Sequence, residues 1–288
     1  MKGRNKEIDP DKLYLSPSSI ITFNQCPKRW WLKYVERVEE KPTIHLIKGL
    51  AIHNVIENLF KQVKKLSEAY KIQLSKKASA LLETEWKKTE RLKLTKQELE
   101  KHHKDAVFII NRFINNLCDT ISCYINLDKA GNPTHAFHLL KPQLSEIDFK
   151  DDNLKIRGRI DAIQRDFDNN IIIVDYKTSS KYKNTLPHDY KLQLAIYAYL
   201  YYKQEGKIPS MLCLNYLRYN ESFYIITNMD LIKYAINEIK NVRNFLKDNI
   251  KNGEEFYKKS SKLCDYCSYK NICNDLGKEN GCQQRLSV

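Results

Sequence analysis

The first part of the chain carries apolar residues at the spacing of amphipathic helices. The pattern predicts a helix over residues 16–34, which opens with a serine and a proline and is broken or kinked at Cys26 and Pro27. A second helix is predicted from about Lys48 onward. Residues 65–125 keep a helical pattern that is rich in charge, and we interpret them as a helical insertion.

The next part of the chain, residues 136–178, changes to a pattern typical of β-strands. The apolar run at 171–174 predicts a strand that is buried on both faces. The predicted strands cover residues 138–147, 155–164, 170–178, 212–219 and 223–227. The predicted later helices cover residues 190–202 and 229–250. We therefore expect an α/β fold in which helices flank a central mixed sheet.

The domain organisation predicted from these elements is simple, because the chain shows no internal repeat and no low-complexity tract. We expect one domain over residues 14–288, preceded by a polar and mobile N-terminus at 1–13. A cysteine-bearing tail without clear periodicity is predicted at about 260–288.

The charge of the chain favours a polyanionic partner. The 288 residues include 49 Lys and Arg against 35 Asp and Glu, which gives a formal net charge of +14. Nucleic acid is the commonest partner of such a surface, although a solvated basic surface is the alternative.

No apolar run approaches the roughly 20 residues that span a bilayer, and the N-terminus has no signal-peptide core. We expect a cytoplasmic protein that has no membrane partner.

Three charged residues on two neighbouring predicted strands carry the most informative chemistry. Asp175 and Lys177 stand two apart on one strand, so they point to the same face, and Asp161 lies on the preceding strand. Carboxylates hold Mg²⁺ or Mn²⁺, and a lysine beside them orients water or neutralises charge on a phosphate. The alternative is a surface hairpin with an ordinary ion pair. Charges directly after so apolar a strand are costly, which favours the functional interpretation.

Two further sites add candidate ligands and contacts. His53 lies in the second helix and can serve as an additional metal ligand, although a lone helical histidine is more often structural. Gln193 and Tyr197 are four apart on a predicted helix and therefore share a face. We expect Gln193 to reach a metal-bound water or a phosphate, and Tyr197 to contact the backbone or a base of the nucleic acid. The alternative is a helix whose polar residues simply face solvent.

The cysteines predict a metal centre in a compartment that keeps thiols reduced. Cys264, Cys267 and Cys273 form a C-x2-C-x5-C pattern, Cys26 is the best fourth ligand, and Cys282 is a weaker alternative. Four thiolates suit either Zn²⁺ or a [4Fe–4S] cluster, and spacing leaves that choice open. The remaining cysteines are predicted to lie in the core: Cys118, Cys123 and Cys213.

Taken together, these motifs resemble the PD-(D/E)XK nuclease superfamily in its RecB-like iron–sulfur branch. This branch includes the nuclease domain of AddB-type helicase–nucleases and small CRISPR-associated exonucleases. The motifs that carry the resemblance, in the order of the family, are LSPSSIITFNQCPKRWWLKYV, GLAIHNVIE, GRID, IVDYKTS, QLAIY and CDYCSYKNIC. The chain has no P-loop pattern, so we do not expect it to carry the helicase half of an AddB-type enzyme.

The resemblance implies a PD-(D/E)XK core fold and a role for each matching residue. The implied metal ligands are His53, Asp161, Asp175 and the carbonyl of Tyr176. The implied catalytic residues are Asp161, Asp175, Lys177, Gln193 and Tyr197. The implied ligands of a [4Fe–4S] cluster are Cys26, Cys264, Cys267 and Cys273, with structural Zn²⁺ as the alternative. Glu146 matches an upstream acidic position of the family, but its strand register is uncertain.

The function predicted from these observations is Mg²⁺- or Mn²⁺-dependent hydrolysis of DNA, most consistent with an exonuclease on single-stranded ends. An endonuclease or flap-processing enzyme is the alternative within the enzyme class. A catalytically idle DNA-binding subunit of a repair complex is the alternative outside it. A helicase and other proteins of DNA repair, recombination or CRISPR adaptation are candidate partners.

Overall fold

The structure is a computed structural model that describes residues 8–273, except for 41, 92–93, 167, 183 and 252–254. The chain divides into two compact units. Unit 1 consists of Met1–Lys41, Lys150–Arg157 and Lys233–Val288, and unit 2 consists of Pro42–Phe149 and Gly158–Ile232. Unit 2 holds the candidate acid–lysine site, and unit 1 holds the candidate cysteine site.

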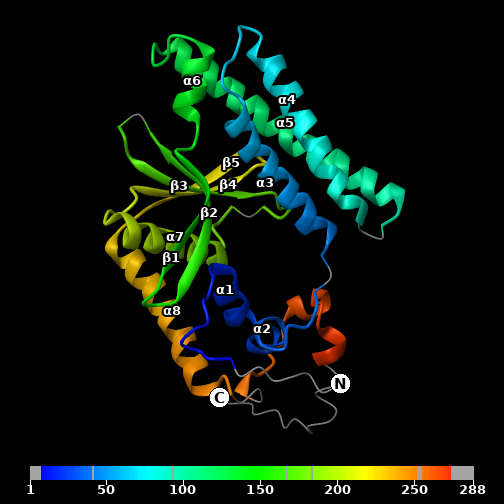
Figure 1. The fold of residues 1–288 in the computed structure, drawn as a ribbon, viewed down its shortest axis with the longest axis vertical. Helices are drawn as coiled ribbons and strands as arrows, with labels where there is room; N and C mark the ends of the chain where they lie inside the picture. Colours follow the sequence, from blue (N-terminus) through cyan, green and yellow to red (C-terminus); the bar gives the residue numbers. More distant parts are fainter. Residues whose placement is uncertain are drawn as a thin grey trace. The chain divides into compact units, whose positions relative to one another are not determined.

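A five-stranded mixed sheet forms the centre of the fold (Figure 1). The strands are β1 (Leu144–Asp151), β2 (Ile156–Arg165), β3 (Ile171–Lys177), β4 (Met211–Tyr216) and β5 (Glu221–Ile226). They lie in the order β1-β2-β3-β4-β5. β3 runs parallel to β4, whereas β2 and β3, and β4 and β5, are antiparallel pairs. The predicted mixed sheet flanked by helices is therefore confirmed.

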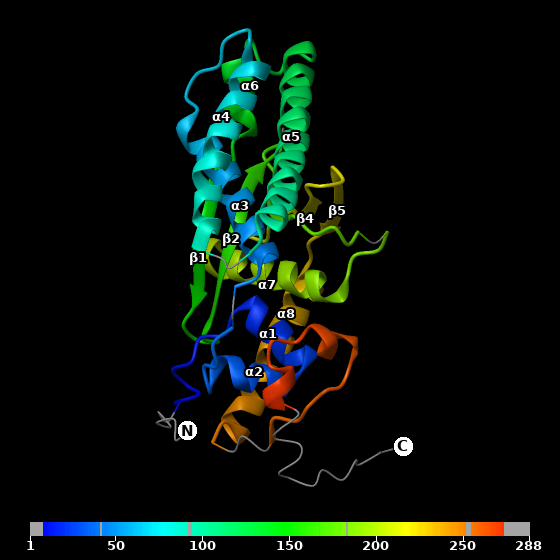
Figure 2. The ribbon, with the colours of Figure 1, turned by 90° about the vertical axis from the view of Figure 1, so that its right-hand side faces the viewer.

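Four helices of unit 2 share one core with one face of the sheet. They are α3 (Ile44–Gln62), α4 (Tyr70–Trp86), α5 (Lys96–Asn126) and α6 (Pro133–Leu140). Their buried residues join Ala162, Val174 and Cys213 of the sheet. Figure 2 shows α4 and α5 as long neighbouring helices, and with the short helix η1 (Lys87–Arg91) they occupy the segment predicted as a helical insertion.

The other face of the sheet packs against α7 (His188–Glu205), which contacts β3 and β4. Side chains alternate along a strand, so Ile173 and Leu212 point away from the α3 core, and both are fully buried. The apolar run of β3 thus serves both layers, which explains why it lacks a polar face.

Two sequence predictions about element boundaries were wrong, and capping explains both. The strand predicted at 138–147 begins only at Leu144, because α6 extends to Leu140. Asn132 caps α6 by accepting a hydrogen bond from the His135 amide, so a helix starts there. The second helix begins at Ile44 rather than near Lys48, because Thr43 accepts from the amide of Leu46.

Unit 1 is built around α1 (Pro17–Gln25), α2 (Pro27–Tyr34) and the larger part of α8 (Met229–Asn249). Cys26 separates α1 from α2, as the proline after it predicted. The rings of Phe23 and Phe245 lie 5.0 Å apart, and Trp30 stacks on Phe256 at 5.7 Å. Aromatic packing of this kind forms the core of the unit. No helix among the described residues is both long enough and apolar enough to cross a membrane.

Candidate active site

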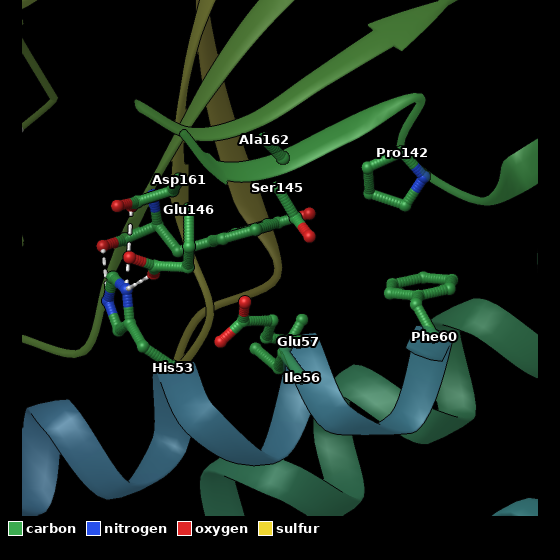
Figure 3. Close-up of a pocket in the computed structure, with 10 residues that line it drawn as sticks. His53, Ile56, Glu57, Phe60, Pro142, Ser145, Glu146, Asp161 and Ala162 are labelled. Atoms are coloured by element: carbon green, nitrogen blue, oxygen red, sulfur yellow. Dashed lines mark hydrogen bonds and ion pairs between the residues drawn. The ribbon is translucent and has the colours of Figure 1, made fainter. Parts of the chain in front are cut away.

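Three candidate metal ligands meet where α3 passes over the sheet (Figure 3). The Nδ1 atom of His53 lies 3.5 Å from Oδ2 of Asp161 and 3.9 Å from Oε1 of Glu146. Within the described part of the chain, these residues form the one set of three whose ligand atoms all lie within 4.8 Å of one another. Two carboxylates and an imidazole are a donor set that suits a divalent cation.

The backbone of β3 fixes two of these side chains. The Asp161 carboxylate accepts a hydrogen bond from the Tyr176 amide at 2.8 Å, and Nε2 of His53 lies 3.1 Å from the Tyr176 carbonyl oxygen. The position of the Asp161 side chain is therefore fixed by a backbone N–H of the neighbouring strand. The Tyr176 carbonyl, which the resemblance implied as a metal ligand, contacts His53 in this structure.

The second set of candidate residues lies on the α7 side of β3 and forms a continuous chain of contacts. Lys177 Nζ lies 2.5 Å from Oδ2 of Asp175 and donates to Oε1 of Gln193 at 2.9 Å. Nε2 of Gln193 then donates to the hydroxyl of Tyr197 at 2.9 Å. Asp175 and Lys177 share a face of the strand, and Gln193 and Tyr197 share a face of the helix, as their spacings predicted.

The close approach of α7 depends on a glycine. A Cβ atom added to Gly158 would lie 3.0 Å from Cδ1 of Leu200 and 3.2 Å from Cε1 of Tyr197. Any side chain at this position would push against α7, which carries Gln193 and Tyr197. The GRID motif thus supplies a glycine that allows α7 to pack closely, in addition to the carboxylate of Asp161.

Burial sets the electrostatics of the acid–lysine pair. Asp175 is 2% exposed, and this burial raises its pKa above the ordinary value, although Lys177 opposes the shift. Burial lowers the pKa of Lys177, but the charge and hydrogen bond of Asp175, together with the charge of Asp161, raise the pKa overall. The lysine is therefore held protonated beside the acid.

The carboxylates around His53 make the site strongly negative, which favours a bound positive charge. Burial lowers the pKa of His53, but hydrogen bonds to Asp161 and Glu146 and the charge of Asp175 raise it to about 10. Oδ2 of Asp175 is buried and has no hydrogen bond of good geometry, even though Lys177 lies close to it. Both observations fit a site that holds a divalent cation.

Glu146 is the residue whose place the sequence left uncertain. It adopts a left-handed backbone conformation, with φ of +53°, within strand β1. A left-handed residue interrupts the alternation of a strand, and this re-aims its side chain. The alternating pattern of the sequence therefore does not reveal where this side chain points.

Sequence reasoning missed three other residues at the site. Glu57 lies one turn after His53 and lines the same pocket (Figure 3). Arg159 is two residues before Asp161, and its Nη1 atom lies 3.8 Å from Oε2 of Glu146. The ring of Tyr190 lies 4.6 Å from Lys177 Nζ. Helical and strand spacing from the named residues would have found Glu57 and Arg159.

The cysteines of the predicted metal centre lie in unit 1. Cys26 accepts a hydrogen bond from the Arg29 amide at the start of α2, and Cys264 lies in the short helix η3 (Lys262–Tyr266). Burial raises the pKa of the Cys273 thiol; Lys258 opposes this, and the nearby thiols of Cys26 and Cys267 add to it. The coordination of a metal by these four thiols stays a prediction.

The other cysteines are placed as follows. Cys118 and Cys213 are buried, as predicted, whereas the prediction for Cys123 was wrong because it is exposed near the end of α5. Cys282 lies outside the described residues.

Comparison with known proteins identifies the family of the chain. The family model of the PD-(D/E)XK nuclease superfamily matches residues 14–274. A protein of Eubacterium rectale with the provisional name exonuclease has a similar solved structure, with 14% identity and a TM-score of 0.50 over 100% of this chain and 96% of that one. The structure of SSO0001 gives 13% identity and a TM-score of 0.38 over 96% and 88%. No curated protein sequence matches. The match to the family model covers most of the chain, including all the candidate residues that meet at the site, and the chain belongs to the PD-(D/E)XK nuclease superfamily.

Proposed function

We propose that this protein is a divalent-metal-dependent deoxyribonuclease that acts as an exonuclease on single-stranded DNA ends. The observation that carries the proposal is the buried Asp175–Lys177 pair, tied to Gln193 and located beside a compact set of metal ligands. Members of this superfamily use divalent metals, and the acidic set around His53 fits such an ion.

The residues that would hold Mg²⁺ or Mn²⁺ are His53, Asp161 and Asp175, with Glu146 and the Tyr176 carbonyl as further donors. When bound, the ion supplies positive charge that lowers the pKa of a water ligand and neutralises charge on a phosphate. The protein contributes a fixed arrangement of carboxylates, because the Tyr176 amide holds Asp161 in place.

Lys177 would act on the phosphate or on the attacking water. Its ammonium group is held between the Asp175 carboxylate and the Gln193 amide oxygen, so its direction is set before substrate binds. A preorganised positive charge stabilises the negative charge that develops during phosphodiester cleavage. Tyr197 fixes the Gln193 amide by accepting its N–H, so the tyrosine supports the lysine through the glutamine.

The substrate follows from charge and from the family. The net charge of +14 favours binding to a phosphate backbone, and nucleases of this superfamily act on DNA. An endonuclease or flap-processing activity uses the same groups. A buried acid–lysine pair argues against the alternative of an idle DNA-binding subunit, because burying charges costs free energy and a subunit without catalytic activity gains nothing from it.

End-labelled DNA of defined polarity tests the proposal directly. The wild type with Mn²⁺ should shorten single-stranded DNA stepwise from one labelled end, and Lys177→Ala should leave it intact. Lys203→Ala, which changes an exposed lysine near the end of α7, is the matched control and should cleave normally. Internal fragments from the start would favour an endonuclease, and intact DNA with every variant would exclude a nuclease.

For the cysteines we propose a [4Fe–4S] cluster held by Cys26, Cys264, Cys267 and Cys273, with Zn²⁺ as the alternative. All four are free thiols of intermediate exposure, and thiolates suit both centres. Protein purified without oxygen should be brown and contain about four iron atoms per chain. A colourless protein with stoichiometric zinc would show that the centre is a zinc site.

A further inference from the structure

Helix α3 carries an exposed apolar stripe that leads into the candidate active site. Leu46 and Leu50 are 66% and 61% exposed. Together with His53 and Glu57 they follow the spacing i, i+4, i+7 and i+11, which places all four on one side of the helix. Figure 3 shows His53 and Glu57 projecting from this side of α3 toward the strands.

The stripe lies close to the reacting groups. A helix rises about 1.5 Å per residue, so Leu50 lies about one turn and Leu46 about two turns from His53 along the axis. A Cβ atom on Gly49 would lie 3.3 Å from Oγ1 of Thr178, the residue after Lys177. The N-terminal turns of α3 therefore pass beside the end of β3, where the acid–lysine pair stands.

The exposure of the two leucines does not come from a loose helix end. Thr43 caps α3 by accepting from the Leu46 amide. On another side of the helix, Lys48 is only 6% exposed, and its Nζ lies 2.5 Å from Oδ2 of Asp105, which also pairs with Arg218. The first turns are therefore anchored, and the leucines are presented to solvent by a fixed backbone.

From this placement we propose that Leu46 and Leu50 contact the faces of unpaired bases next to the scissile phosphate. This proposal rests on the nuclease function proposed above and names the form of DNA that its site accepts. The phosphate of a bound strand has to reach His53 and Lys177, so neighbouring nucleotides pass within one or two helical turns. Apolar side chains have no charge or hydrogen-bond donor with which to bind a phosphate, but they can pack on the apolar faces of bases.

The stripe then selects single strands, because paired and stacked bases do not present their faces. A duplex has to be unpaired and unstacked before the same contact forms, and this costs free energy. The stripe continues along the same helix to His53, a candidate metal ligand, and this continuity favours a DNA strand over a protein partner.

Fluorescence anisotropy with oligothymidylate tests the proposal without cleavage. All variants carry Lys177→Ala and are measured in Mg²⁺, on a normal strand and on one whose terminal nucleotides are abasic. Adding Leu46→Ser and Leu50→Ser should raise the Kd for the normal strand about fivefold to tenfold, as expected for lost apolar burial. Ile72→Ser on α4, where Ile72 is 60% exposed, is the matched control and should leave the Kd unchanged.

The abasic strand makes the test specific. The parent should bind it as weakly as the double leucine variant binds the normal strand, and the leucine changes should cost nothing further on it. An unchanged Kd on the normal strand, or an equal loss on both strands, would overturn the proposal. These binding results are independent of the cleavage ladder, so failure of the nuclease function would be recognised separately.

Discussion

The two candidate metal sites of this chain are built in different ways. In unit 2, His53 and Asp161 are held by the backbone of Tyr176, and Lys177 is held by Asp175 and Gln193. In unit 1, Cys26, Cys264 and Cys267 lie at helix caps or in a short helix, and the described cysteines include no set of three with sulfur atoms within 4.8 Å of one another. The first site is organised by the fold itself.

The difference suggests different roles for the two sites. A preorganised site on a sheet suits catalysis, because its charges need no rearrangement when the substrate arrives. A site formed by thiols from separate segments gains its order from the metal, so metal binding contributes to folding there. We therefore expect changes in unit 2 to affect chemistry and changes to the cysteines to affect stability.

After the loss of cleavage expected for Lys177→Ala, the largest effect is expected for Asp161→Asn. The amide keeps the shape of the side chain but removes a negative charge that the divalent ion needs, so cleavage should fall about a thousandfold. Calorimetry should show weakened Mn²⁺ binding, and the melting temperature should stay within about 3 °C. Asp168→Asn on the exposed β2–β3 turn is the control. A variant that unfolds would break the proposed contrast between the two sites.

The next largest effect is expected for Cys267→Ser, this time on stability. Loss of one ligand from a metal centre that ties segments together should lower the melting temperature clearly and release metal. Cys123→Ser, at an exposed cysteine of α5, should leave both unchanged. Cleavage lost at an unchanged melting temperature would contradict a structural role for Cys267.

A smaller effect is expected for Gly158→Ala. The new methyl group meets Leu200 at 3.0 Å and Tyr197 at 3.2 Å, so overpacking should cost about 1–3 kcal/mol in unfolding free energy. The shifted Tyr197 should also slow cleavage about tenfold. Gly131→Ala has nothing within 4 Å and provides the control. Normal activity and stability of Gly158→Ala would show that α7 tolerates displacement.

The smallest effect is expected for Tyr197→Phe. The substitution removes the hydroxyl that accepts a hydrogen bond from the Gln193 amide and keeps the buried ring. The protein therefore loses about one hydrogen bond. Single-turnover cleavage should slow about fivefold to tenfold, with Mn²⁺ affinity unchanged. Wild-type rates in this variant would mean that Gln193 needs no support from the tyrosine.

The sequence predicted which side chains of the candidate site share a face, because their spacing encodes it. Asp175 and Lys177 at i, i+2, and Gln193 and Tyr197 at i, i+4, lie on common faces as strand and helix geometry require. The mixed sheet was likewise predictable from the apolar strands. Periodicity is a local property, and these features depend on it alone.

The parts that could not be predicted depend on contacts between distant segments. Glu146 reaches the site through a left-handed residue in β1, which no alternation pattern reveals. Tyr190 approaches Lys177 only because α7 packs on β3. The start of α6 was missed because Asn132 and Pro133 suit a turn as well as a helix cap.

The central claim is that a preorganised lysine drives metal-dependent cleavage. The most direct test is the single-turnover cleavage rate of labelled single-stranded DNA in Mn²⁺, compared between the wild type and Lys177→Ala. The account predicts a loss of about a thousandfold or more, with Mn²⁺ affinity and melting temperature close to those of the wild type. A Lys177→Ala rate within about tenfold of the wild type would contradict it.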